Sequence, residues 1–88
     1  MYEDVSYLLR SPLRLKIIEC LSSSDKSLTP LDIAKKTDIA RSNVSTKLGE
    51  LVKKNYVTCV NPKDRKWRFY QISNKGKKAL SETIKYQK

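Results

Sequence analysis

With 88 residues, 39% of them hydrophobic, the chain is long enough for one modest core, and we expect a single domain over residues 1–88. No apolar run approaches the roughly 20 residues of a membrane span, and the acidic N-terminus does not resemble a signal peptide, so a cytoplasmic protein without a membrane partner is expected. The chain has no histidine, and Cys20 and Cys59 lie far apart in apolar stretches, which excludes the usual metal-ligand spacings and predicts buried structural thiols.

The first part of the chain predicts helices with well-defined ends. Residues 2–9 place apolar side chains on one face of a short helical segment. Ser11 and Thr29 each precede a proline, and a hydroxyl N-cap followed by proline predicts the start of a helix at both places. Asp38 is expected to end the second of these helices because aspartate tolerates turn conformations.

The second part of the chain changes from a helical to an alternating pattern. A third helix is expected at about residues 41–54, ended by Asn55 in a left-handed conformation. Alternation then predicts strands at residues 56–60 and 67–72, joined by a turn-rich basic loop. Ser73 is expected to cap a last helix. The inward side chains of that helix are expected to be Ala79, Leu80, Thr83 and Ile84.

This order of elements is that of a winged helix-turn-helix domain of the α+β class: three helices, a two-stranded wing hairpin and a C-terminal helix. Ala34 supplies the small residue that the motif needs where its two helices touch. In that fold the third helix enters the major groove of DNA, and the hairpin, or wing, lies beside it.

The excess positive charge lies entirely in the second half of the chain. Of the formal net charge of +10, residues 1–40 contribute nothing, with six basic and six acidic side chains, whereas residues 41–88 hold thirteen basic and three acidic ones. A polyanion would be attracted to such a surface and would release counterions on binding. A polyanionic partner is therefore expected, and a merely solubilising basic surface is the alternative.

The outward face of the predicted third helix carries side chains that can read DNA. Arginine can bind guanine, asparagine can bind adenine, and serine or threonine can bind bases or phosphates. The residues expected to face the major groove are Arg41, Ser42, Asn43, Ser45, Thr46 and Lys47. An ordinary helical hairpin with a solvated face is the alternative, but it would be expected to carry more Glu–Lys pairs four residues apart.

The predicted wing at residues 61–68 is strongly basic, and a narrow cationic hairpin tip suits the minor groove. The residues expected to meet DNA there are Lys63, Arg65, Lys66 and Arg68. Of the aromatic residues Trp67, Phe69 and Tyr70, two are expected to pack on the core or along the sheet rather than stack on bases. Phosphate contacts are expected for Thr29, Lys53 and Lys54.

Several segments resemble winged helix-turn-helix regulators of the MarR and ArsR type, particularly the short one-domain forms common in archaea. Residues 42–51 and the following Asn55-Tyr56-Val57 resemble the recognition helix and the entry to the wing. Asp64-Arg65-Lys66 is similar to the wing tip of MarR proteins, and residues 70–76 resemble their strand-to-helix segment. The likeness covers about residues 10–82.

The resemblance implies a homodimer on a pseudo-palindromic operator, joined through terminal helices that would here be residues 2–9 and 79–86. It also implies that Arg65 and Lys66 face the minor groove and that six residues face the major groove: Arg41, Ser42, Asn43, Ser45, Thr46 and Lys47. The chain departs from these families at Ala40, where a capping serine is common, and at Asn55, where glycine is usual. It also lacks the paired cysteines of metal sensors.

The function expected from these features is that of a sequence-specific, double-stranded DNA-binding transcriptional regulator without cofactor or metal. A non-specific architectural protein that coats DNA is an alternative, and so is a protein-interaction winged helix within a larger assembly. An enzyme is the least expected class, because the sequence has no nucleophile–base pair and no phosphate-binding glycine loop.

Overall fold

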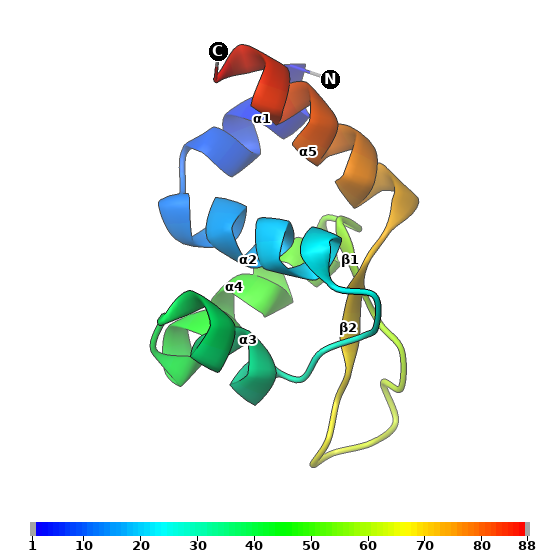
Figure 1. Cartoon of the computed structure of the whole chain (residues 1–88). Helices are drawn as coiled ribbons and strands as arrows, with labels where there is room; N and C mark the ends of the chain where they lie inside the picture. Colours follow the sequence, from blue (N-terminus) through cyan, green and yellow to red (C-terminus); the bar gives the residue numbers. More distant parts are fainter. Residues whose placement is uncertain (1, 88) are drawn as a thin grey trace.

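The computed structural model describes residues 2–87 and has the winged helix architecture that the sequence predicts (Figure 1). Within that range the elements are α1 (Tyr2–Leu9), α2 (Pro12–Ser23), α3 (Pro30–Thr37), α4 (Arg41–Lys53), β1 (Val57–Cys59), β2 (Tyr70–Ile72) and α5 (Asn74–Tyr86). None of these helices is long and apolar enough to cross a membrane.

The helices begin and end where short-range signals in the sequence place them. Ser11, Thr29 and Ser73 each accept a backbone amide three residues further along the chain, as N-cap residues do. At Thr29 the cap is reciprocal, because the Asp32 carboxylate accepts the Thr29 amide at 3.1 Å. Asp38 follows α3 in the left-handed conformation, with φ of 60°. These caps confirm the predicted starts of α2, α3 and α5.

The five helices form two groups around one core. Helices α2, α3 and α4 pack against one another, while α1 and α5 pack together on the opposite side of α2, where both chain ends lie (Figure 1). The largest fully buried side chains come from all five helices, from β1 and from the segment before α3: Val5, Leu8, Ile17, Ile18, Leu28, Ile33, Val44, Leu48, Leu51, Val57 and Thr83. Burial of a side chain of this size contributes about 1.5–3 kcal/mol, so the core fixes the orientation of each helix.

The hairpin is shorter than the sequence predicts. β1 and β2 pair antiparallel, with Val57 opposite Ile72 and Cys59 opposite Tyr70, so the expected strands at residues 56–60 and 67–72 lose their outer residues. The other edge of β2 is also covered, because the amide and carbonyl of Tyr70 bond with those of Leu28 at 2.7 and 2.9 Å. This bridge anchors the segment before α3 to the hairpin.

Three expectations about burial are wrong. Of the wing aromatics, only Tyr70 packs against the core, whereas Trp67 is 57% and Phe69 36% exposed. The paired strands end at Tyr70, and Trp67 and Phe69 lie in the loop before it, outside the buried cluster of side chains. Ile84 is exposed rather than inward, and both cysteines are half-buried free thiols.

Candidate nucleic-acid interface

Helix α4 turns its apolar face into the core and its polar face to solvent. Val44, Leu48 and Leu51 are buried, which fixes the rotation of the helix about its axis. Exposed on the other sides are Arg41, Ser42, Asn43, Ser45 and Thr46, five of the six residues expected to face DNA. The Thr46 hydroxyl donates to the Ser42 carbonyl at 3.0 Å and so presents its oxygen lone pairs outward. The first turn has no side-chain cap, because Ala40 precedes it.

Lys47, the sixth residue, is held within the domain. Its side chain is half-buried, with Nζ 3.5 Å from Oε1 of Glu50. The same oxygen accepts a hydrogen bond from Nε of Arg14 at 2.9 Å, and this bond holds the pKa of the Glu50 carboxyl below its ordinary value. Arg14 also donates to the Tyr7 carbonyl at 3.1 Å and lies over the Tyr7 ring, 4.0 Å from its centroid. This network ties α4 to α2 and α1.

A hollow of about 390 Å³ separates α4 from the hairpin loop; we call it the wing hollow. Its walls are the start of α3 at Thr29, the α4 residues Arg41, Ser45 and Gly49, and the wing from Arg65 to Arg68. Four of the lining side chains are cations and none is a carboxylate. The tertiary structure therefore brings Arg41 of the predicted recognition helix to the same hollow as three predicted wing cations, Arg65, Lys66 and Arg68. The other two predicted cations, Lys47 and Lys63, do not line it.

The wing is held in shape by two side chains, Asn61 and Asp64, for which the sequence predicted no such bracing role. The Asn61 amide donates to the Trp67 carbonyl at 2.7 Å, and its oxygen accepts the Phe69 amide at 2.8 Å. Oδ1 of Asp64 accepts the amides of Lys66 and Trp67 at 2.9 and 2.8 Å, which lowers the pKa of the Asp64 carboxyl. The turn-forming preference of asparagine and aspartate is the only signal for these roles in the sequence.

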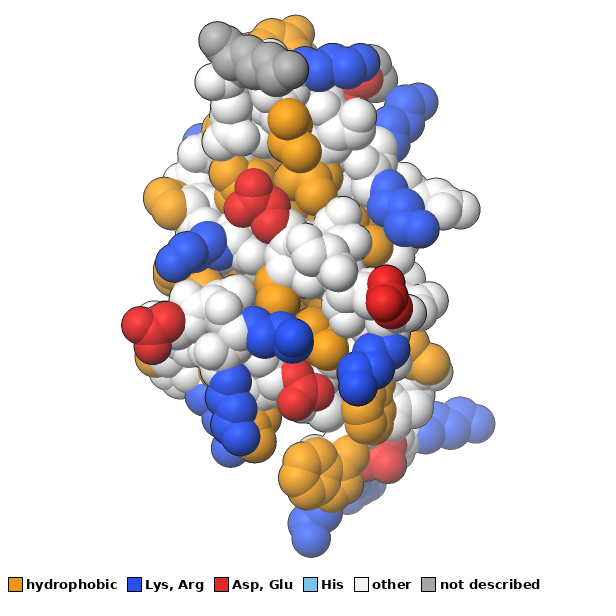
Figure 2. All heavy atoms as spheres, in the orientation of Figure 1, with side chains coloured by type: hydrophobic (Ala, Val, Ile, Leu, Met, Phe, Trp, Pro, Cys, Tyr) orange, Lys and Arg blue, Asp and Glu red, His pale blue; other side chains and the backbone are white. Residues whose placement is uncertain are grey.

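The predicted wing cations differ in whether a hydrogen bond within the wing holds the side chain. Lys63, Arg65 and Lys66 are exposed at the loop. Arg68 is also exposed, but its Nε donates to the Asp64 carbonyl at 2.8 Å, which positions the guanidinium across the turn. Figure 2 shows basic and apolar side chains side by side at the lower end of the molecule, where Figure 1 places the hairpin loop.

The three residues predicted to contact phosphate are dispersed. Thr29 is only 7% exposed, and its hydroxyl accepts the Asp32 amide at 3.1 Å at the edge of the wing hollow. Lys53 is exposed on the last turn of α4. Lys54 lies near α1, with Nζ 5.7 Å from the centroid of the Tyr7 ring.

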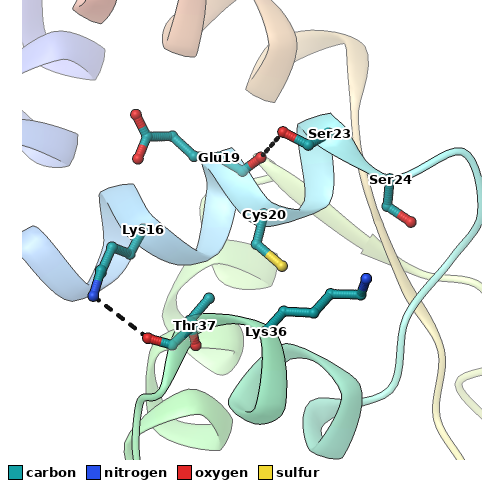
Figure 3. Close-up of a pocket in the computed structure, with 7 residues that line it drawn as sticks. All are labelled: Lys16, Glu19, Cys20, Ser23, Ser24, Lys36 and Thr37. Atoms are coloured by element: carbon teal, nitrogen blue, oxygen red, sulfur yellow. Dashed lines mark hydrogen bonds between the residues drawn. The ribbon is translucent and has the colours of Figure 1, made fainter.

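A second hollow, of about 490 Å³, lies between α2 and α3 (Figure 3). Lys16 crosses it to donate to the Thr37 carbonyl at 3.4 Å, and the Cys20 thiol points toward α3 near Lys36. Burial raises the pKa of the Cys20 thiol, and the opposing effect of Lys36 is smaller. A thiol with a raised pKa is a poor nucleophile, which accords with a structural role.

Comparison of the sequence with known families matches residues 13–87 to the winged helix DNA-binding domain family. The chain belongs to this family. The match includes the helix-turn-helix, the wing and α5, so it covers both walls of the wing hollow. No curated protein matches the sequence.

Solved structures of MarR-type regulators share this winged helix fold. MarR from E. coli superposes with a TM-score of 0.77 at 19% identity, covering 94% of this chain and 62% of that one. YusO from Bacillus subtilis gives a TM-score of 0.77 at 23% identity over 93% and 58% of the two chains. A mutant of E. coli MarR complexed with operator DNA gives a TM-score of 0.75 at 19% identity, covering 94% of this chain and 59% of that one. The winged helix chain thus spans about three fifths of the length of these neighbours.

Proposed function

We propose that this winged helix domain is a sequence-specific regulator of transcription that binds double-stranded DNA, with residues 41–54 in the major groove and the wing at residues 61–68 near the minor groove. The observation that carries the proposal is the wing hollow, where Arg41 from α4 faces Arg65, Lys66 and Arg68 from the wing with no carboxylate among the lining residues. A cationic concavity of this kind concentrates field lines and attracts a polyanion.

The chemistry of α4 supports reading of sequence rather than coating alone. Ser42, Asn43 and Ser45 are exposed, short and polar, and can hydrogen-bond base edges in the major groove. A purely electrostatic surface would need only lysine and arginine there. Among the structural neighbours, E. coli MarR has been solved with operator DNA and CouR with a 23-mer duplex.

We assign roles to the remaining predicted residues on the same basis. Lys63, Arg65, Lys66 and Arg68 approach the minor groove, and Lys53 binds phosphate. Lys47 and Lys54 take part through the phosphate backbone, since each ammonium also has a neighbour inside the domain, Glu50 and the Tyr7 ring respectively. Thr29 bonds phosphate by donating its hydroxyl proton, because phosphate oxygens accept and the Thr29 amide already donates to Asp32.

A non-specific DNA-coating protein is the second candidate. The observation that favours it is the row of exposed lysines at the start of α5, Lys75, Lys77 and Lys78, which carries charge without base-reading groups. Such a surface would bind any duplex with strong salt dependence.

Selection of preferred sequences from a random DNA pool, together with a salt titration on random duplex, separates the two candidates. A two-fold symmetric consensus, with half-sites about 34 Å apart, would support a dimeric specific regulator. Tight binding without any consensus would support the coating protein and would contradict our assignment of α4.

Two single substitutions test the division of labour between helix and wing. Arg41→Ala is expected to cost about 1–3 kcal/mol on the preferred sequence and little on random DNA, because a base contact is lost. Lys66→Ala is expected to weaken all duplexes alike and to reduce the slope of log affinity against log salt by about one. Equal losses on both kinds of DNA for Arg41→Ala would remove that residue from base reading.

A further inference from the structure

Trp67 is the only tryptophan of the chain, and the fold leaves it in contact with solvent. Its side chain is 57% exposed and lines the wing hollow. An indole is among the most apolar of side chains, and such groups are usually covered by the core or by a partner. Nothing in the DNA-reading role of the neighbouring cations requires an aromatic residue at this position.

The backbone of Trp67 is fixed although its ring is exposed. Its amide donates to Oδ1 of Asp64 at 2.8 Å, and its carbonyl accepts the Asn61 amide at 2.7 Å. A ring displayed on a braced turn loses less conformational freedom when a partner covers it. The wing therefore presents the indole to whatever enters the hollow.

The wall of the hollow that α4 supplies leaves room for a partner beside the ring. Two of the three α4 residues that line the hollow, Ser45 and Gly49, have small side chains or none. A methyl group built on Gly49 would meet no atom within 4 Å. The cations Arg41, Arg65 and Lys66 line the same space, which selects a polyanion. A partner that fits must offer negative charge and apolar faces together, as a DNA strand does with its phosphates and deoxyribose rings.

We propose that Trp67 is a DNA-contacting residue of the wing, whose ring packs on the deoxyribose of a strand lying in the wing hollow while Arg65 and Lys66 hold the adjacent phosphates. The proposal rests on the proposed DNA-binding function. A sugar contact carries no base information, so Trp67 contributes affinity for every duplex rather than choice among sequences.

The test uses the fluorescence of this single tryptophan during a titration with end-labelled duplex. Anisotropy of the label reports binding independently, and iodide and acrylamide report how accessible the ring is. On saturation with DNA, the emission of Trp67 is expected to shift to shorter wavelength, and quenching by both agents is expected to fall several-fold. Iodide is repelled by DNA charge, so the neutral acrylamide decides whether the ring is covered.

Substitutions complete the test. Trp67→Ala is expected to lower affinity about tenfold for the preferred sequence and for random duplex alike, and Trp67→Phe is expected to recover part of the loss. Phe69→Ala is the matched control, because Phe69 is an exposed aromatic of the same wing that does not line the hollow; it should change affinity less than about twofold. Circular dichroism and thermal unfolding check that each variant is folded.

Four outcomes would overturn the proposal. Saturating DNA that leaves the acrylamide quenching of Trp67 unchanged would exclude the contact while DNA binding itself still held. If Trp67→Ala lowered affinity only for the preferred sequence, the ring would contact a base rather than a sugar. Shielding of Trp67 with rising protein concentration in the absence of DNA would assign the hollow to a second copy of the chain. Absence of any duplex binding at low salt would overturn both this proposal and the proposed function.

Discussion

The two glycines of the chain both lie on helices, but in opposite surroundings. Gly49 is on the exposed side of α4, where an added Cβ meets nothing within 4 Å. Gly76 is buried in the first turn of α5, and a Cβ there would lie 2.1 Å from the Tyr56 carbonyl oxygen and 2.8 Å from Cγ1 of Ile72. The absence of a side chain at Gly76 lets α5 approach the backbone that enters β1.

The first prediction is that alanine acts with opposite sign at these two sites. Gly49→Ala is expected to stabilise the domain by about 0.5–1 kcal/mol, because it lowers the entropy that the helix loses on folding. Gly76→Ala is expected to cost at least about 1–3 kcal/mol, because the Tyr56 backbone must move to admit the methyl group. Urea unfolding followed by circular dichroism measures both. Similar effects at the two sites would contradict the close approach at Gly76.

Glu50 makes the stability of α4 depend on pH. The hydrogen bond from Arg14 lowers the pKa of this carboxyl in the folded state. A depressed pKa means that the stabilisation is fully present above the ordinary glutamate pKa, near 4.3, and is lost as the pH falls through the folded-state value.

We therefore expect Glu50→Gln to lower the free energy of unfolding at neutral pH by roughly 0.5–1 kcal/mol, a modest figure because the side chain is 34% exposed and screened by solvent. Its stability should also fall less steeply than that of the wild type between neutral and acidic pH. Some acid sensitivity should remain, since hydrogen bonds from Thr29 lower the pKa of Asp32 as well. Parallel pH profiles of the two proteins would exclude Glu50 as a source of the dependence.

At the scale of elements, the wing differs from the helices in what holds it. The helices are fixed by their caps and buried faces, whereas the loop of residues 60–69 is braced mainly by the side chains of Asn61 and Asp64. It has few apolar contacts with the core, and such segments open locally at low cost. A substitution can therefore change the conformation of the wing without changing the free energy of unfolding of the domain.

Asn61→Ala is expected to leave the thermal midpoint nearly unchanged while hydrogen exchange of the Phe69 amide becomes faster. Affinity for any duplex should fall several-fold, because the wing must then be ordered on binding. Asn74→Ala, which removes an exposed asparagine side chain at the start of α5, serves as control. It should change neither the exchange of the Phe69 amide nor the affinity for DNA. Unchanged exchange at Phe69 in Asn61→Ala would show that the brace is dispensable.

The helix boundaries were predictable because their signals act within one turn of chain. Thr29 caps α3 through an amide three residues away, and Asn55, with φ of 67°, ends α4 as expected. The strand boundaries were not predictable, because the alternation of apolar and polar residues over 67–72 does not show where the pairing of the two strands stops. The strands pair as far as Cys59 and Tyr70, and one more backbone bond follows toward the loop, from the Val60 amide to the Phe69 carbonyl at 2.8 Å. The Asn61 side chain then takes the place of the backbone as the partner of the Phe69 amide and the Trp67 carbonyl.

The whole molecule has two ends with different surfaces. It measures 37 × 24 × 22 Å, with α1, α5 and both chain ends at one end and the hairpin loop at the other (Figure 1). Near the first end Leu9 and Ile84 are 42% and 45% exposed, although both are large and apolar. We propose that α1 and α5 join two copies of the chain there, away from the DNA-facing end.

Ile84→Glu is expected to convert such a dimer to a monomer without unfolding it, because the side chain is already exposed. Sedimentation velocity at several concentrations measures this, and binding to a two-fold symmetric site should weaken at the same time. Val60→Glu changes an equally exposed residue of the wing end and should leave the oligomeric state unchanged. A wild-type protein that sediments as a monomer at every concentration would contradict the dimer.

The order of the helices and hairpin, the caps that bound the helices and the apolar residues that α4 buries all follow from the sequence alone. They depend on hydrogen bonds and apolar spacing within a few residues of each site. Other features arise only on folding: Arg14 binds Glu50, 36 residues away, and so helps to keep Lys47 half-buried, and Trp67 lines the wing hollow together with Arg41. Such pairings depend on how the core orients α2, α4 and the hairpin, and no local pattern encodes the distance between segments that meet only after folding.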